Sequence, residues 1–230
     1  MKDEPAVPSH IALAMHASRS RARRKGISLQ QVFREDLDRI KEIIEAVVER
    51  GVGVVSFLLS SQKMRQSSHF PLQVDTLEQL ICGLREWDGL RDLGVKVRVM
   101  GKWYDLPTSV IDAIKGLISE TQDNSTCVVN LCINYDGKEE IVDACRMIAR
   151  RVETGKIDSS GIDQQAIKDQ LYTSDLPPVD LLIKTGNAHR INAFLLWDIS
   201  HATLVFPDKP WSRFSKADLR KAIARFQRFP

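Results

Sequence analysis

A dense group of basic side chains follows a short apolar run near the start of the chain. The run HIALAM (residues 10–15) is followed by His16, and five of the seven residues from Arg19 to Lys25 are basic. Guanidinium groups pair well with phosphate oxygens, because they can donate two parallel hydrogen bonds. The segment from Met15 to Gly26 holds no carboxylate. A nucleic-acid arm, a targeting signal and the phosphate-binding mouth of an enzyme are the three roles to compare.

Two further polar clusters follow other apolar runs. VGVVSFLL (residues 52–59) is followed by Ser60, Ser61, Gln62, Lys63 and Arg65, and VDLLIKTG (residues 179–186) delivers Lys184, Thr185, Asn187, His189 and Arg190. The first carboxylate after these clusters is Asp198. In doubly wound sheets ligands bind at the carboxyl ends of the strands. The three clusters therefore predict a cationic, hydroxyl-lined pocket for a phosphate or diphosphate. Ordinary polar loops are the alternative.

Alternating apolar and amphipathic segments must position these clusters. Strands are predicted at residues 10–15, 52–59, 95–101, 127–135, 179–186 and 202–207, and helices at residues 29–51, 74–94, 107–122, 137–155 and 215–229. Several strands are apolar on both faces, as in parallel sheets covered on both sides. We expect one α/β domain over residues 1–230, a mainly parallel six-stranded sheet wrapped by helices, with residues 1–9 flexible.

The composition limits the partners and the compartment. The chain of 230 residues has a net charge of only +3, and 43% of it is hydrophobic, so the whole chain does not look like a nucleic-acid binder. None of the four cysteines forms a C-x-x-C pair, and Cys127, Cys132 and Cys145 lie in apolar segments, which predicts buried free thiols. The N-terminus has no apolar signal core, so we expect a cytoplasmic protein, with peripheral membrane contact left open.

Three blocks of the sequence resemble one family. Residues 171–206, LYTSDLPPVDLLIKTGNAHRINAFLLWDISHATLVF, resemble the C-terminal half of the cis-prenyltransferases, the undecaprenyl diphosphate synthases. VVNLCINYDGKEEIVDA (residues 128–144) is similar to the middle pattern L-N-x-A-x-N-Y-G-G-R-x-E-I-x-D-A. HIALAM and the eleven residues to Gly26 match the first block in spacing and partly in letters. The resemblance implies a twisted parallel sheet, usually a homodimer, and joining of isopentenyl diphosphate to an allylic diphosphate with magnesium.

The departures from the family pattern fall on its acidic residues. The aspartate after the first strand is His16 here, and the glutamate of the late strand is Thr203. In the second block only the serine at Ser61 survives. Magnesium needs hard oxygen ligands, and histidine is a poor one, so the usual magnesium site is in doubt and no metal ligand is assigned. His16 is the candidate catalytic residue, with a space-filling role as its alternative.

The cationic half of the family site is retained in charge. The family's two diphosphate-gripping arginines map onto Lys184 and Arg190, and a nearby serine maps onto Asn192. The predicted diphosphate-binding residues are Ser18, Arg19, Ser20, Arg21, Ser61, Lys184, Arg190 and Asn192.

Two functions compete at this point. The first is a divergent enzyme that transfers or rearranges a prenyl group by altered, metal-independent chemistry. The second is an inactive subunit that pairs with an active family member. A nucleic-acid or acidic-membrane binder is disfavoured, because the net charge is small and no stacking aromatics accompany the basic cluster.

Overall fold

All six predicted strands are present, and they form one parallel sheet. The computed structural model describes residues 6–15, 26, 28–62, 70–186 and 190–228. The strands are β1 (His10–Ala14), β2 (Val54–Leu58), β3 (Val95–Met100), β4 (Cys127–Cys132), β5 (Leu181–Lys184) and β6 (Thr203–Val205). They lie in the order β3-β4-β2-β1-β5-β6, and each neighbouring pair is parallel. The carboxyl ends of β1, β2 and β5 therefore meet at one edge, as the sequence predicted, and the carboxyl end of β4 lies beside them.

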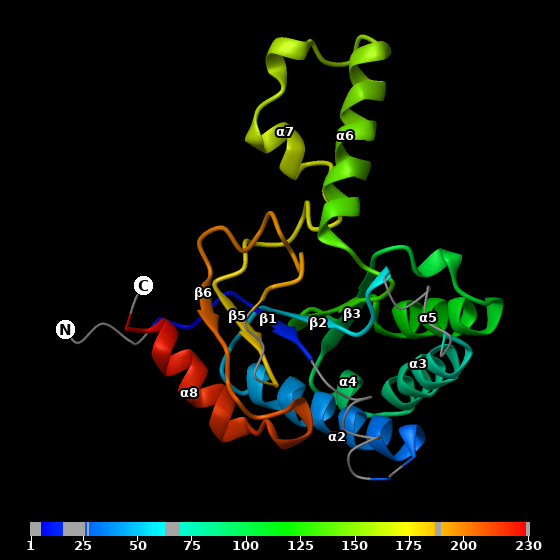
Figure 1. Cartoon of the computed structure of the whole chain (residues 1–230), viewed down its shortest axis with the longest axis vertical. Coiled ribbons are helices and arrows are strands. Elements are labelled where there is room, and N and C mark those ends of the chain that lie inside the picture. The colour runs from blue at the N-terminus through cyan, green and yellow to red at the C-terminus, as the bar shows by residue number, and fades with distance from the viewer. Residues whose placement is uncertain (1–5, 16–25, 27, 63–69, 187–189, 229–230) are drawn as a thin grey trace.

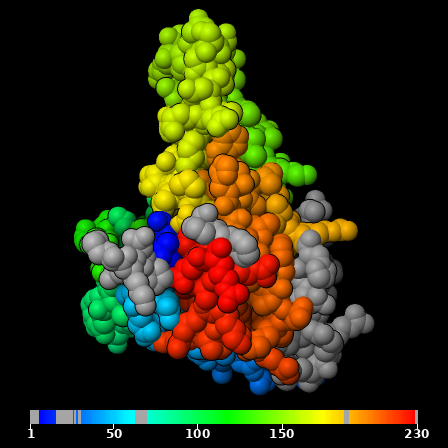
Figure 2. Space-filling model, turned by 90° about the vertical axis from the view of Figure 1, so that its left-hand side faces the viewer, coloured from blue at the N-terminus to red at the C-terminus, as the bar shows by residue number. Residues whose placement is uncertain are grey.

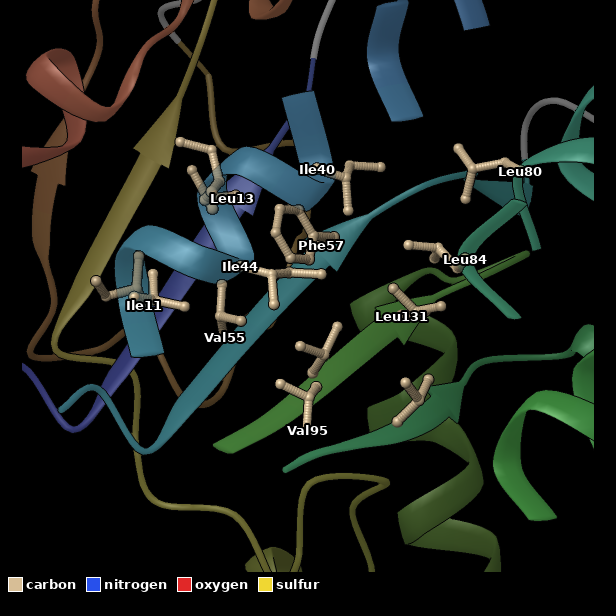
Figure 3. Packing of buried hydrophobic residues seen from close by; sticks show 14 of the residues in the cluster. Ile11, Leu13, Ile40, Ile44, Val55, Phe57, Leu80, Leu84, Val95 and Leu131 are labelled. Atoms are coloured by element: carbon tan, nitrogen blue, oxygen red, sulfur yellow. The ribbon is translucent and has the colours of Figure 1, made fainter. Parts of the chain in front are cut away.

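Four helices cover one face of this sheet (Figure 1). They are α2 (Leu29–Val48), α3 (Phe70–Arg85), α5 (Thr108–Thr121) and α8 (Lys216–Phe226). Ile40 and Ile44 of α2 pack over Val55 and Phe57 of β2, and all four side chains are fully buried (Figure 3). Burying such a side chain contributes about 1.5–3 kcal/mol. The main core therefore lies between the sheet and these helices.

Serine side chains cap the starts of two of the covering helices. The Ser28 hydroxyl accepts a hydrogen bond from the Gln31 backbone N–H at 3.1 Å, which caps α2. After α2 the chain turns at Gly51 with φ +70°, a conformation that favours glycine. Ser215 and Asp218 form a reciprocal capping box at the start of α8.

The opposite face is covered by irregular chain rather than by packed helices. A second cluster includes Ala12, Leu182, Tyr135 and Phe194, and the segment around residues 171–202 supplies most of its outer layer. From this side α6 (Gly137–Glu153) and α7 (Gln164–Lys168) project as an arm, which we define as residues 137–170. The arm stands clear of the body in both views (Figures 1 and 2).

Two sequence expectations about local structure are wrong. The single helix predicted over residues 74–94 is two helices, because α3 ends at Arg85 and the short α4 (Gly89–Asp92) follows. The break lets the Trp87 ring lie against Gly89, where a Cβ would be 2.2 Å from the ring, and buries Leu90. Cys127 and Cys132 are buried as predicted, but Cys145 is exposed because α6 belongs to the projecting arm.

Two further expectations concern the ends of the chain and the membrane. Within residues 1–9 the structure describes residues 6–9, and the Ser9 amide donates to the Asp180 carboxylate at 2.6 Å. None of the helices in the described part of the chain is both long and apolar enough to cross a membrane.

Candidate functional site

A polar hollow opens at the carboxyl edge of the sheet, where the sequence placed the ligand. Its volume is about 500 Å³. We call it the mouth, and its lining comes from the ends of β1, β2 and β5, the start of α6 and the loop after β5: Ala14, Met15, Leu58, Leu59, Ser60, Ser61, Tyr135, Asp136, Lys138, Lys184, Asn192, Ala193 and Phe194. The mouth brings ammonium, hydroxyl and amide groups together, which are the donors that a diphosphate needs.

Lys184 is the buried cation of the mouth. It is the last residue of β5 and is 4% exposed. Its Nζ donates a hydrogen bond to the Arg190 carbonyl, so the lysine holds the loop that follows its own strand. Burial lowers the pKa of the ammonium below its usual range. An anion in the mouth would offset this desolvation, because opposite charge favours the charged form.

The end of β2 is fixed against the end of β4 by hydrogen bonds. The Ser60 hydroxyl accepts from the Asn134 backbone N–H at 2.8 Å, and the Ser60 carbonyl accepts from the Tyr135 N–H at 3.1 Å. Ser61 continues the contact as an isolated parallel bridge to Tyr135. These bonds give the two serines at the mouth a rigid backbone.

The start of α6 adds two features that the sequence analysis did not predict. Asp136 caps the helix by accepting from the Lys138 N–H at 2.9 Å, and both residues line the mouth. A helix N-terminus favours anions. Asp136 also brings a carboxylate where the family pattern has glycine. Asp136 directly follows the strand predicted at residues 127–135, whose carboxyl end was not among the three used to predict the site.

An apolar chamber adjoins the mouth between α2 and α3. It measures about 80 Å³ and shares Met15, Leu58, Leu59, Ser60 and Ser61 with the mouth. The rest of its lining is Phe33, Asp36, Phe70, Gln73, Val74, Leu77, Leu80, Leu106 and Asn134. A polar hollow that opens into an apolar one suits an amphiphile with an anionic head and a hydrocarbon tail.

Glu140 of α6 is a buried carboxyl that holds the mouth residue Tyr135 in place. It is 1% exposed, its Oε2 accepts from the Tyr135 hydroxyl, and its Oε1 accepts from the Tyr172 N–H at 2.9 Å. Burial raises the pKa of this carboxyl to about 7, against the effect of the two hydrogen bonds. The contact holds Tyr135, a mouth residue, on α6.

Glu140→Gln is expected to change how stability depends on pH. In the wild type the folded pKa lies above the unfolded value, so this group stabilises the fold below pH 4.5 and the contribution is lost as pH rises to about 7. Glutamine stays neutral, its Oε1 can accept from the Tyr172 N–H and its Nε2 can donate to the Tyr135 hydroxyl oxygen, so the variant should gain on the order of 3 kcal/mol relative to wild type between those pH values. Urea unfolding of both proteins from pH 4.5 to 8 checks this. A constant difference across that range would contradict it.

The structure brings some of the predicted site residues together and leaves others apart. Ser61, Lys184 and Asn192 line the mouth, whereas Arg190 has an exposed side chain and contributes its carbonyl to Lys184. Predicted site residues His16, Ser18, Arg19, Ser20 and Arg21 lie outside the described residues. In the sequence these residues directly follow Met15, which lines the mouth.

Thr203 and Asp198 lie away from the mouth. Thr203 begins β6 and pairs with Leu181 at the amino end of β5, so it is not at the carboxyl edge where the mouth opens. Asp198 is 3% exposed; it accepts from the Thr173 hydroxyl at 2.6 Å and is paired with Lys168. Asp198 is the first carboxylate after the predicted site residues in the sequence. In the structure its side chain bonds Thr173 and Lys168 of α7 instead of facing the mouth.

The described mouth residues do not fit a magnesium ion. No three His, Cys, Asp or Glu side chains gather at one point in the described part of the chain. The mouth has the single carboxylate Asp136 in that part, and one of its oxygens caps α6. Proteins usually bind magnesium through one or two carboxylates, with waters and substrate phosphates completing the shell, and the Asp136 carboxylate already accepts from the Lys138 N–H.

The chain is similar to known proteins over nearly its whole length. The family model "Putative undecaprenyl diphosphate synthase" matches residues 15–229. A tritrans,polycis-undecaprenyl-diphosphate synthase (geranylgeranyl-diphosphate specific) of Methanopyrus kandleri is 32% identical over 98% of this chain and 84% of that protein. An isoprenyl transferase of Halalkalibacterium halodurans is 31% identical over 98% of this chain and 88% of that protein.

Two solved structures of prenyl diphosphate synthases have a similar fold. Lavandulyl diphosphate synthase from Lavandula x intermedia, in complex with dimethylallyl diphosphate, has a TM-score of 0.89 and 25% identity, covering 96% of this chain and 95% of that one. A probable undecaprenyl diphosphate synthase from Campylobacter jejuni has a TM-score of 0.79 and 22% identity over 98% of this chain and 97% of that one, which supports the fold. The chain belongs to the family of undecaprenyl diphosphate synthases and isoprenyl transferases, the cis-prenyltransferases.

Proposed function

We propose that this chain binds a short allylic diphosphate and transfers or rearranges its prenyl group by chemistry that does not depend on magnesium. The observation that carries the proposal is the adjoining pair of hollows, one polar with a buried lysine and one small and apolar. The diphosphate would lie against Lys184, Asn192 and Ser61 in the mouth, and the prenyl tail would enter the chamber.

The size of the chamber supports a short substrate. At about 80 Å³ it is on the order of half of an apolar cavity that holds one benzene ring, which suits a group of about five carbon atoms. The similarity to a synthase that binds dimethylallyl diphosphate supports the same size class. A long polyprenyl chain would require α2 and α3 to separate.

Loss of the family carboxylates supports the altered chemistry. When an allylic diphosphate ionises, the C–O bond breaks, the diphosphate leaves with the electron pair, and positive charge develops on the prenyl group. Cations must stabilise the leaving group. Lys184 can do this from its buried position, and Arg19, Arg21 and His16 belong to the segment that follows the mouth residue Met15.

An inactive partner subunit is the second candidate, and the arm favours it. Val142 and Met147 of α6 are 40% and 44% exposed, which leaves apolar side chains on a projecting helix. Exposed apolar side chains on such a helix can pack against a second chain, either another copy or an active family member. In that case the mouth would bind a diphosphate without turning it over.

Product analysis separates the two candidates. The protein is incubated with dimethylallyl diphosphate, alone and with isopentenyl diphosphate, in magnesium and in EDTA, and the dephosphorylated products are identified by mass spectrometry. A new prenyl product in EDTA that is absent with Lys184→Ala supports the proposed enzyme. Product formed only with magnesium contradicts the altered chemistry. Binding without any product favours the partner subunit.

A further inference from the structure

Gln73 places a buried amide in the wall of the apolar chamber. It lies on α3, is 8% exposed, and lines the chamber beside Val74 and Leu77. Within the part of the chain that the structure describes, neither its Oε1 nor its Nε2 has a hydrogen-bond partner. The other buried residues of α3 are Val74, Thr76, Leu77, Leu80, Ile81 and Leu84, and the Thr76 hydroxyl is satisfied by the Leu72 carbonyl.

An unsatisfied amide is costly at this position. Leaving a buried donor or acceptor without a partner costs about 1–3 kcal/mol, whereas methionine has a similar shape and no such cost. Phe70, Val74 and Leu77 offer the amide only hydrocarbon, and the polar groups that also line the chamber make no hydrogen bond to it. The partner of Gln73 is therefore a molecule that enters the chamber.

The chemistry of that partner follows from the two ends of the amide. Nε2 donates and Oε1 accepts, so a hydroxyl group satisfies both, because it accepts at its oxygen and donates its proton. A phosphate satisfies only Nε2, and a hydrocarbon satisfies neither.

We infer that Gln73 forms a specificity site for a hydroxyl group on the prenyl tail, so that the chain prefers hydroxylated prenyl diphosphates to their plain hydrocarbon counterparts. The inference rests on the proposed function, because it assumes that the tail enters the chamber while the diphosphate stays in the mouth.

Paired ligands test this inference. Dimethylallyl diphosphate is compared with its 4-hydroxy derivative, and geranyl diphosphate with its 8-hydroxy derivative, by isothermal titration of wild type, Gln73→Met and Gln122→Met. Gln122 is exposed after α5 and serves as the matched control. At one of the two chain lengths, wild type and Gln122→Met should bind the hydroxylated ligand about tenfold more tightly or better, the effect of roughly one hydrogen bond.

The Gln73→Met variant should no longer prefer the hydroxylated ligand, and it should keep the fold. It should bind the plain ligand more tightly than wild type does, lose its preference for the hydroxylated one, and unfold at a higher temperature. Equal affinity of wild type for both members of each pair, or a preference that survives in Gln73→Met, overturns the inference while the proposed function stands. Failure of all four ligands to bind overturns both.

Discussion

Replacing Lys184 by alanine is expected to weaken the binding of dimethylallyl diphosphate by about 10- to 100-fold, since a hydrogen bond to a charged group contributes about 1.5–3 kcal/mol and 1.4 kcal/mol is tenfold in affinity. Lys184 is the buried cation of the mouth, at 4% exposure. The substitution also leaves the Arg190 carbonyl without its donor, so the loop after β5 loses a contact. Isothermal titration gives the affinity directly.

Two variants show whether the lost affinity reflects the cation. Lys184→Arg keeps the charge and restores the residue type of the family pattern, so it should bind within a few-fold of wild type. Lys156→Ala removes an exposed lysine after α6, on the arm, and should leave binding unchanged. If Lys184→Ala binds the ligand as tightly as Lys156→Ala does, the diphosphate does not occupy the mouth as proposed.

Gly137→Ala is expected to destabilise the fold and disturb the mouth together. A Cβ at Gly137 would lie 2.4 Å from the Ala193 carbonyl oxygen and 3.2 Å from the Leu196 Cβ. The Gly137 N–H also donates to that carbonyl at 2.9 Å, so the contact cannot open without losing a hydrogen bond. The opposing loop has little freedom, because Asn192 and Ala193 already have φ of +52° and +57°.

The expected loss for Gly137→Ala is about 3 kcal/mol of unfolding free energy, the upper part of the range for overpacking. Affinity for dimethylallyl diphosphate should fall as well, because Asn192 and Ala193 line the mouth. Gly161→Ala is the control, since a Cβ there meets nothing within 4 Å. Urea unfolding of the two variants should differ by most of that amount. Equal stability of the two variants would show that close packing of Gly137 against Ala193 does not stabilise the fold.

The strands and most helices could be predicted because their signals are local. Apolar runs such as HIALAM mark strands buried on both faces, and the amphipathic pattern of residues 29–51 marks α2. The failures arise where tertiary contacts decide. The break between α3 and α4 depends on Trp87 packing against Gly89, and the exposure of Cys145 depends on α6 leaving the body.

The site residues also fall into those that local signals predict and those that only tertiary packing reveals. Ser61, Lys184 and Asn192 could be predicted, because each lies at or just after the end of a parallel strand or in a family motif. Gln73 could not, because a polar residue in the first turn of a helix is ordinarily exposed, and only the packing of α3 against α2 buries it. The position of Thr203 follows from the register of β6 on β5, which no local signal reveals.

The mouth is proposed to bind a short allylic diphosphate through its own cations. Isothermal titration of the wild-type protein with dimethylallyl diphosphate, in EDTA and again in magnesium, tests it most directly. We expect saturable one-to-one binding in EDTA that is little changed by magnesium and weakened about 10- to 100-fold by Lys184→Ala. Binding that appears only with magnesium, or that Lys184→Ala leaves intact, would contradict the account.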